Sequence, residues 1–445
     1  MFLELINKSY WVIGFILYIC FSVSIKSSEY FYMYIVSFAT FLILGIIINI
    51  WKNRIYNFTK LNLFFTVFVS LLIESTLIQM VSFYIDGDTF VFSKIDALIY
   101  YTESLKMCRM SVVESFRYLN NNYNFDDWGT SLWISSIFRI IPSKLFLNFS
   151  YYILSSISAI MMFDIGRCLM PKRYAYIAAL TFSVSSFSAA QGSMISKEII
   201  TAFLVITSFY LFYSFLRRKN KIYLVSSFLF PLLLLFFRIP VALLLIFSFG
   251  LTLILMYSKG IFIIILGSIL LLIIYSSSFF ALTYERYLRG GDVETIIERK
   301  MEMTDGGGAL SQVADPLAAL AGPFPSVMMN TIKNTSFFAS GLLYRALLTV
   351  PFFLGVYYAF RHKYQRIYPL IFFFLTNAMG VMISVKGLEF RLSFSHLSMV
   401  YLVAFWWLSR YDCWQIKKRL PGIIIYVYPI IIAVICFVWN LRYAI

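Results

Sequence analysis

Long apolar runs, separated by short polar segments, repeat along almost the whole chain. A helix that crosses the hydrocarbon core of a bilayer needs about 20 mostly apolar residues, and about thirteen runs come near that length. These runs cover residues 10–23, 31–50, 63–85, 145–165, 174–190, 199–216, 222–237, 239–257, 261–282, 337–360, 367–385, 393–408 and 422–439. The pattern therefore predicts an all-α fold, with one polytopic transmembrane bundle of about thirteen helices over residues 1–445.

Basic residues occupy alternate connections between these runs. The connections around Lys52, Arg167, Arg217, Arg361 and Arg410 all carry several Lys or Arg residues. If the runs simply alternate across the bilayer, these connections share one side, which the positive-inside rule makes cytoplasmic. We therefore expect a cytoplasmic N-terminus. The first apolar run lacks a small-residue cleavage site and is expected to be retained.

Composition agrees with a membrane protein and argues against two other classes. The chain is 61% hydrophobic and 13% charged, whereas soluble domains have about 45–50% apolar and about 25% charged residues. The net charge of +16 lies mainly in the short basic connections, so it does not indicate nucleic-acid binding. The five cysteines show neither disulfide nor zinc spacing, and we expect neither feature.

Two long hydrophilic loops are predicted on the outer side, over residues 86–144 and 283–336. The first loop ends in an amphipathic stretch, residues 131–141, which is expected to lie on the membrane surface. The second contains a charged helical stretch, three glycines at 306–308 and a turn-rich segment at 321–326. No internal repeat is visible.

Charged side chains near the outer ends of the spans are the first candidates for a site. A charge at the bilayer centre costs at least ~2.5–3.5 kcal/mol, so such residues are functional candidates by default. Guanidinium groups bind phosphate in a bidentate manner, which suits a lipid-linked phosphate or pyrophosphate. Snorkelling of single helix-end cations is the alternative. The candidate binding residues are Lys197, Arg238, Arg345 and Arg391, of which the last lies in a polar cluster with Lys386, Glu389 and His396.

Carboxylates and one histidine on the same side are candidates for proton transfer. A carboxylate or a histidine can accept a proton from an attacking hydroxyl group. The candidate catalytic residues are Asp86, Asp88, Asp96, Glu198 and His396. The other carboxylates of the first loop are Glu103, Glu114, Asp126 and Asp127, and Glu114 is interpreted as an ordinary solvated charge. His396 is equally well explained by packing. We expect no cofactor, although Asp86 and Asp88 have the spacing to hold a divalent cation through oxygen ligands.

Four short motifs give the layout a resemblance to a known family. The sequence DALIY at 96–100 is followed by G-T-S-x-W at 129–133, by S-K-E at 196–198 and by F-R at 237–238. This order resembles bacterial polytopic glycosyltransferases of the GT-C-like superfamily, and especially Wzy-type O-antigen and capsule polymerases. The resemblance covers most of residues 86–259. It implies a multi-pass protein of the bacterial inner membrane.

The resemblance also implies an activity and its partners. A growing glycan on undecaprenyl pyrophosphate would be transferred to a new lipid-linked repeat unit at the outer face, giving O-antigen or capsule polysaccharide. Arg238, Arg391 and Arg345 would bind pyrophosphate, and an acid or His396 would orient or deprotonate the acceptor. Tyr100 and other loop aromatics would contact sugar, unless they only anchor the chain at the interface. A chain-length regulator is an expected protein partner. No strong catalytic signature is present, so the base stays unassigned.

Other functions remain open at this point. A ligase of the same chemistry, or a GT-C enzyme that uses a polyprenyl-phosphate sugar, would depend on a first-loop carboxylate such as Asp86, Asp88 or Asp96. A lipid-linked oligosaccharide flippase or another transporter would be expected to contain broken helices. The Ser- and Gly-rich segment at 182–193 could mark such a break. A non-catalytic membrane scaffold is a third alternative, but it would not explain the arginines on the outer side.

Overall fold

The computed structural model describes residues 2–25, 27–54, 58–91, 94–123, 125–257, 320–322, 324–327, 335–383, 393–413 and 422–441. Every regular element within these ranges is a helix. The first half contains α1 (Phe2–Ser22), α2 (Ser28–Asn53), α3 (Lys60–Asp86), α4 (Lys94–Met107), α5 (Val112–Asn122), η1 (Phe125–Asp127), α6 (Trp128–Phe138), α7 (Lys144–Leu169), α8 (Lys172–Ser183) and α9 (Ser186–Ser193). The remainder contains α10 (Glu198–Arg218), α11 (Lys221–Leu229), η2 (Phe230–Phe236), α12 (Ile239–Met256), η3 (Thr335–Phe338), α17 (Ala339–Leu347), α18 (Thr349–Arg361), η4 (Gln365–Ile367), α19 (Tyr368–Ile383), α20 (Phe394–Cys413) and α21 (Gly422–Leu441).

Seven helical segments of the described chain are long and apolar enough to cross a membrane. They are α1, α2, α3, α7, α10, α12 and the combined segment Ser336–Arg361. The prediction of a helical, multi-pass membrane protein is therefore confirmed. The count of about thirteen spans stays a prediction. Its ninth run, residues 261–282, lies outside the described residues.

The exposed and buried faces of the helices are those expected for helices surrounded by lipid. On α3, the apolar side chains Phe65, Val69 and Ile73 recur every fourth residue and are exposed, while Ser70 and Glu74 on another face are buried. An amphipathic helix of a water-soluble protein has the opposite arrangement. Exposed apolar stripes at the helical period are stable when the surrounding solvent is hydrocarbon. This arrangement supports membrane insertion independently of helix length.

The basic connections meet at one end of the bundle, which we call the basic end. Lys60 Nζ lies 2.6 Å from Asp164 Oδ2, which joins the start of α3 to the last turns of α7. The Arg173 guanidinium donates to the Lys52 carbonyl at 3.1 Å, which joins α8 to the end of α2. This common end fits the predicted alternation of the spans. That the basic end faces the cytoplasm stays a prediction.

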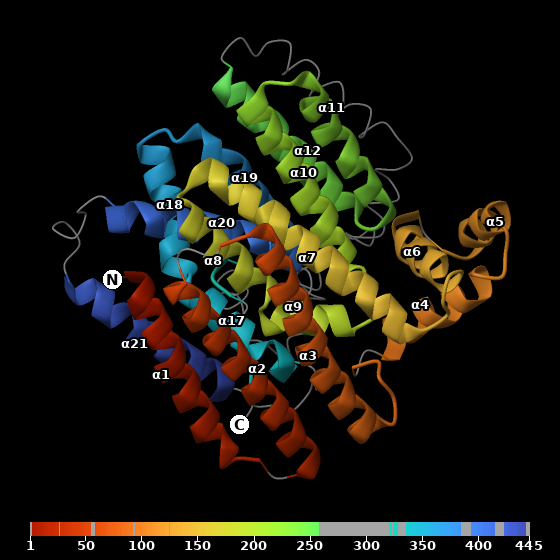
Figure 1. Ribbon diagram of the computed structural model, residues 1–445, viewed down its shortest axis with the longest axis horizontal. Coiled ribbons are helices and arrows are strands. Elements are labelled where there is room, and N and C mark those ends of the chain that lie inside the picture. Colours follow the sequence, from red (N-terminus) through yellow and green to blue (C-terminus); the bar gives the residue numbers. More distant parts are fainter. Residues whose placement is uncertain are drawn as a thin grey trace.

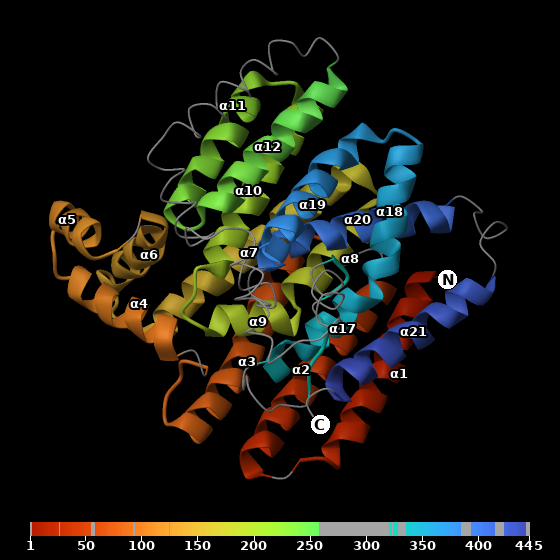
Figure 2. The same ribbon diagram turned by 180° about the vertical axis from the view of Figure 1, so that it is seen from behind.

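The first predicted loop, residues 86–144, folds into a helical subregion at the opposite end, which we call the loop end. Its helices α4, α5 and α6 project from the bundle at the right of Figure 1 and at the left of Figure 2. Helix α4 packs against α6, and α6 in turn contacts α7 and η2. The amphipathic stretch at 131–141 is helical as far as Phe138. Its position at a membrane surface is untested.

The second predicted loop, residues 283–336, lies mostly outside the described residues, including its charged stretch and its three glycines. The described part of the turn-rich segment is buried against α18 and α21, and the Thr349 hydroxyl of α18 donates to the Ala321 carbonyl at 2.9 Å. Phe324 packs against the Trp439 ring, with centroids 5.6 Å apart, and the Asn440 side chain donates to the Pro325 carbonyl at 2.9 Å. This segment is therefore part of the bundle interior.

An interrupted helix packs against α17 near the centre of the bundle. The predicted break in residues 182–193 is present, because α8 ends at Ser183 and Ser185 caps the separate helix α9. The Gly341 amide of α17 donates to Ser186 Oγ at 3.0 Å. A Cβ atom on Gly341 would lie 3.1 Å from the Phe187 backbone nitrogen. The close approach of α17 to α9 therefore depends on glycine, which has no side chain, at position 341.

Candidate functional site

A salt bridge connects the loop subregion to the membrane bundle. Lys197 Nζ lies 2.9 Å from Asp127 Oδ1, and the two side chains are 17% and 18% exposed. Asp127 ends η1, while Lys197 precedes the first residue of α10. The partners are 70 positions apart in sequence. Their contact ties the loop to the start of a long apolar helix.

The next residue of α10 forms a second, more deeply buried ion pair. Glu198 Oε1 accepts a hydrogen bond from the Arg238 guanidinium, and the side chains are 2% and 10% exposed. Glu198 begins α10, where the helix dipole favours a negative charge. Glu198 Oε2 is buried and has no hydrogen-bond partner in the described chain. Arg238 thus binds one carboxylate oxygen of Glu198, while the other oxygen can still accept a hydrogen bond or a proton.

Tyr100 completes this group of residues from the loop side. Its hydroxyl donates to Asp127 Oδ1 at 3.3 Å. Burial raises the pKa of Tyr100 well above its usual value, and the negative charges of Asp127 and Asp96 add to that rise. The phenol therefore stays protonated and keeps its role as a donor. We call Tyr100, Asp127, Lys197, Glu198 and Arg238 the ion-pair network.

Aromatic packing holds the loop against the start of α12. The Phe125 ring lies 4.6 Å from the Phe236 ring, measured between centroids. A Cβ atom on Gly129 would lie 2.7 Å from the Phe237 ring and 2.8 Å from the Phe236 carbonyl oxygen. The glycine of the G-T-S-x-W motif is therefore needed for close contact beside Arg238. Phe237 precedes Arg238 directly, so this packing positions the buried ion pair.

Substitution of Gly129 by alanine should loosen the loop from the bundle. The added methyl group collides with a backbone oxygen that cannot rotate away, and overpacking of this kind costs about 1–3 kcal/mol. We expect faster proteolysis within residues 94–123 and a lower thermal unfolding midpoint. Gly250→Ala is the matched control, because nothing lies within 4 Å of a Cβ atom there. Equal effects of the two substitutions would contradict this role of Gly129.

The predicted site residues thus divide into separate groups. Tyr100, Lys197, Glu198 and Arg238 are brought together, and Asp96 is close enough to act electrostatically on Tyr100. Lys197 and Arg238, which the sequence suggested as free cations for pyrophosphate, are both paired with carboxylates. An anionic ligand would have to compete with Asp127 and Glu198 for them.

Arg345 and His396 lie in a different group, in the interior of the bundle. The Arg345 guanidinium donates to Thr349 Oγ1 at 2.8 Å and to the Leu320 carbonyl at 3.0 Å. His396 is 2% exposed, and its Nδ1 lies 2.7 Å from the Asn377 amide nitrogen. These contacts favour a structural role for both residues. Their proposed roles in binding and proton transfer are untested.

The DxD residues lie at the end of α3, beside the start of α7. Asp88 Oδ1 accepts a hydrogen bond from the Phe90 amide at 2.8 Å, and Asp88 acts electrostatically on Lys144. In the chain as far as it is described, no three His, Cys, Asp or Glu side chains gather in a metal-binding arrangement. A divalent cation at Asp86 and Asp88 stays an untested alternative. Arg391, with Lys386 and Glu389, lies outside the described residues.

Two residues with functional potential were not selected from the sequence. Asp127 was one of several loop carboxylates, and no local signal distinguished it. Glu74 in the middle of α3 is fully buried, and its two carboxylate oxygens have no hydrogen-bond partner in the described chain. A single acid within an apolar run is a recognisable signal for an intramembrane site.

Comparisons with protein-family models, with curated proteins and with solved structures found no match to this chain.

Proposed function

We propose that this protein is a membrane-embedded glycosyltransferase that polymerises lipid-linked oligosaccharide repeat units. The donor and the acceptor would both be carried on undecaprenyl pyrophosphate. The reaction would occur at the loop end, on the outer face of a bacterial inner membrane. The observation that carries this proposal is the ion-pair network. It places the buried Glu198 carboxylate, of which only one oxygen has a hydrogen-bond partner in the described chain, between the loop subregion and the starts of two apolar helices.

The position of the network suits a substrate that is partly lipid and partly sugar. Its residues Lys197, Glu198 and Arg238 lie at the starts of α10 and α12, where a polyprenyl chain could remain between helices while the glycan extends under the loop. Tyr100 offers an aromatic ring and a hydroxyl group at the same place. Amphipathic substrates of this kind need adjacent apolar and polar surfaces.

The proposed chemistry uses the two residues of the buried pair. The acceptor hydroxyl oxygen forms a bond to the anomeric carbon of the donor glycan. The bond from that carbon to the diphosphate oxygen breaks, and the diphosphate leaves with the electron pair. The free oxygen of Glu198 accepts the hydroxyl proton. Arg238, when it exchanges Glu198 for the leaving group, stabilises the negative charge that develops there.

A deletion strain with and without plasmid-borne protein tests this function. We expect the strain to lose its long-chain glycan ladder on gels while it retains lipid that carries a single repeat unit. Restoration of the ladder by the plasmid would support polymerisation. An unchanged ladder in the deletion strain would rule it out.

A transporter of lipid-linked oligosaccharide is the second candidate, and the interrupted helix α8–α9 favours it. Secondary transporters place their substrates at discontinuous helices near the bilayer midplane. Here the break between α8 and α9 lies beside α17, where the Gly341 amide donates to Ser186 Oγ. The same deletion experiment separates the two candidates. Loss of even the single displayed unit, with precursor accumulating inside the cell, would identify transport or an earlier step.

A further inference from the structure

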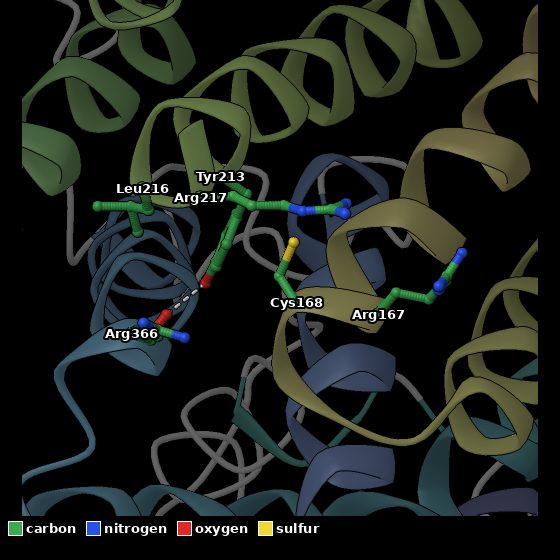
Figure 3. A pocket seen from close by; sticks show the side chains of 6 residues that line it. All are labelled: Arg167, Cys168, Tyr213, Leu216, Arg217 and Arg366. Atoms are coloured by element: carbon green, nitrogen blue, oxygen red, sulfur yellow. Dashed lines mark hydrogen bonds between the residues drawn. The ribbon is translucent and has the colours of Figure 1, made fainter. Parts of the chain in front are cut away.

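A cationic hollow lies at the basic end, away from the ion-pair network. Figure 3 shows one part of it, with Cys168 between Arg366 and Arg167 and with Arg217 above Cys168 in this view. This part has a volume of about 320 Å³. A neighbouring hollow of about 400 Å³ shares Cys168 and Arg366 and adds Lys363 and Arg410.

Four of the five cations of this hollow come from four separate helices. Arg167 lies in the last turn of α7, Arg217 in the last turn of α10, Arg366 in η4 and Arg410 in the last turn of α20. A helix C-terminus attracts a cation, and this explains one basic residue at each end. It does not explain why four segments direct their basic residues to one concavity. Basic residues from four helices around one hollow indicate a binding site for an anionic ligand.

No carboxylate of the described residues forms an ion pair with these cations, which are Arg167, Arg217, Arg366, Lys363 and Arg410. The nearest acid on α7, Asp164, is held by Lys60 at 2.6 Å. The Tyr213 hydroxyl donates to the Arg366 carbonyl at 2.6 Å, which fixes the Arg366 backbone against α10. The hollow therefore keeps its positive charge available.

Apolar side chains form much of the rest of the lining. Leu216 lies beside Arg217, and Met256, Ile367 and Trp406 line the neighbouring part. Leu216, Met256 and Ile367 lie at or next to the ends of bundle helices. Basic pockets between membrane helices bind lipid headgroups that carry phosphate. A soluble anion would gain nothing from the apolar part of the lining.

We propose that this hollow binds the phosphate-bearing headgroup of an anionic lipid. Guanidinium groups from different segments would each donate to phosphate oxygens in bidentate manner, and the lipid chains would lie along the apolar lining. The binding would tie together the ends of α7, α10 and α20 with η4. The proposal depends on membrane insertion but not on the glycosyltransferase activity.

Cys168 provides a direct readout of occupancy. It lines both parts of the hollow and is partly exposed. A variant with Cys20, Cys108 and Cys413 replaced by serine leaves Cys168 and the buried Cys436. The rate of maleimide labelling of Cys168 would be measured on the full chain in phosphatidylcholine nanodiscs. The nanodiscs would contain added cardiolipin, added inorganic pyrophosphate, or neither.

We expect cardiolipin to slow the labelling of Cys168. In the triple variant R167Q/R217Q/R366Q, we expect binding about a hundredfold weaker, at about fivefold for each arginine lost. The matched control is R218Q/R361Q, which removes basic residues from the same end but not from the lining. These residues contact Tyr223 and Tyr357 instead. Thermal unfolding in phosphatidylcholine alone would verify that all variants are folded.

Equal labelling rates with and without cardiolipin, or an equal loss of protection in the control variant, would overturn the proposal. Protection by pyrophosphate but not by cardiolipin would overturn the lipid as the source of the phosphate. Protection of Cys168 by cardiolipin that is lost in the triple variant and kept in the control variant would support the proposal. Because none of these readouts involves glycan synthesis, a failure here would be distinguishable from a failure of the proposed function.

Discussion

Replacement of Glu198 by glutamine is expected to abolish the long-chain glycan ladder while the protein remains in the membrane. Glutamine keeps the shape of the side chain and an oxygen that can accept the Arg238 hydrogen bond. It loses the ability to take a proton, and loss of a general base lowers rates by about 10²–10⁴-fold. The measurement is the glycan profile of a deletion strain that carries the variant at wild-type protein level.

The control for this experiment comes from the loop itself. Glu103 lies in α4, and its carboxylate accepts hydrogen bonds from Lys106, at 2.8 Å, and from Tyr118. Burial alone would raise the pKa of Glu103, but these two hydrogen bonds, together with the charge of Lys106 and a contribution from Tyr123, lower the pKa overall. Glu103→Gln therefore removes a paired loop carboxylate outside the ion-pair network, and it should retain the ladder. A normal ladder in Glu198→Gln would exclude Glu198 as the base.

Replacement of Arg238 by alanine is expected to destabilise the bundle strongly. The substitution leaves the Glu198 carboxylate, which is 2% exposed, without a counter-charge. Removal of one partner of a buried ion pair costs about 3–5 kcal/mol. The thermal unfolding midpoint in detergent should fall, and the amount of folded protein in the membrane should fall with it.

A double-mutant cycle separates this structural effect from a role in substrate binding. The double variant Arg238→Ala/Glu198→Ala removes both charges, so its loss of stability should be smaller than the sum of the two single losses. Additive losses would mean that the two side chains do not interact. Arg238→Lys keeps the charge but not the bidentate geometry. A stable Arg238→Lys protein that makes no polymer would show that the guanidinium also contacts substrate.

The membrane helices could be predicted from the sequence because the free energy of inserting a helix into the bilayer depends mainly on the residues of that helix. An apolar run of sufficient length is stable as a helix in hydrocarbon, whatever lies elsewhere in the chain. For the same reason, the basic connections could be assigned to one end from their alternation alone. The break between α8 and α9 also had a local signal in its Ser- and Gly-rich segment.

The candidate site was only partly predictable. Lys197, Glu198 and Arg238 could be selected because charges beside apolar runs are rare and costly. Asp127 could not be distinguished from the other loop carboxylates, because its importance comes from a contact with Lys197 across 70 positions. Glu74 carried a usable signal, a lone acid inside an apolar run.

By itself, therefore, the sequence determined that the chain forms apolar helices across a membrane and that its basic connections share one end. Only the tertiary structure decided which charges neutralise each other. It paired Arg238 with Glu198, used Arg345 to hold the Leu320 carbonyl, and left Arg167, Arg217 and Arg366 around one hollow. The physical reason is that insertion depends on the composition of each segment. The energy of a charge depends instead on which helix ends lie within a few ångströms of it.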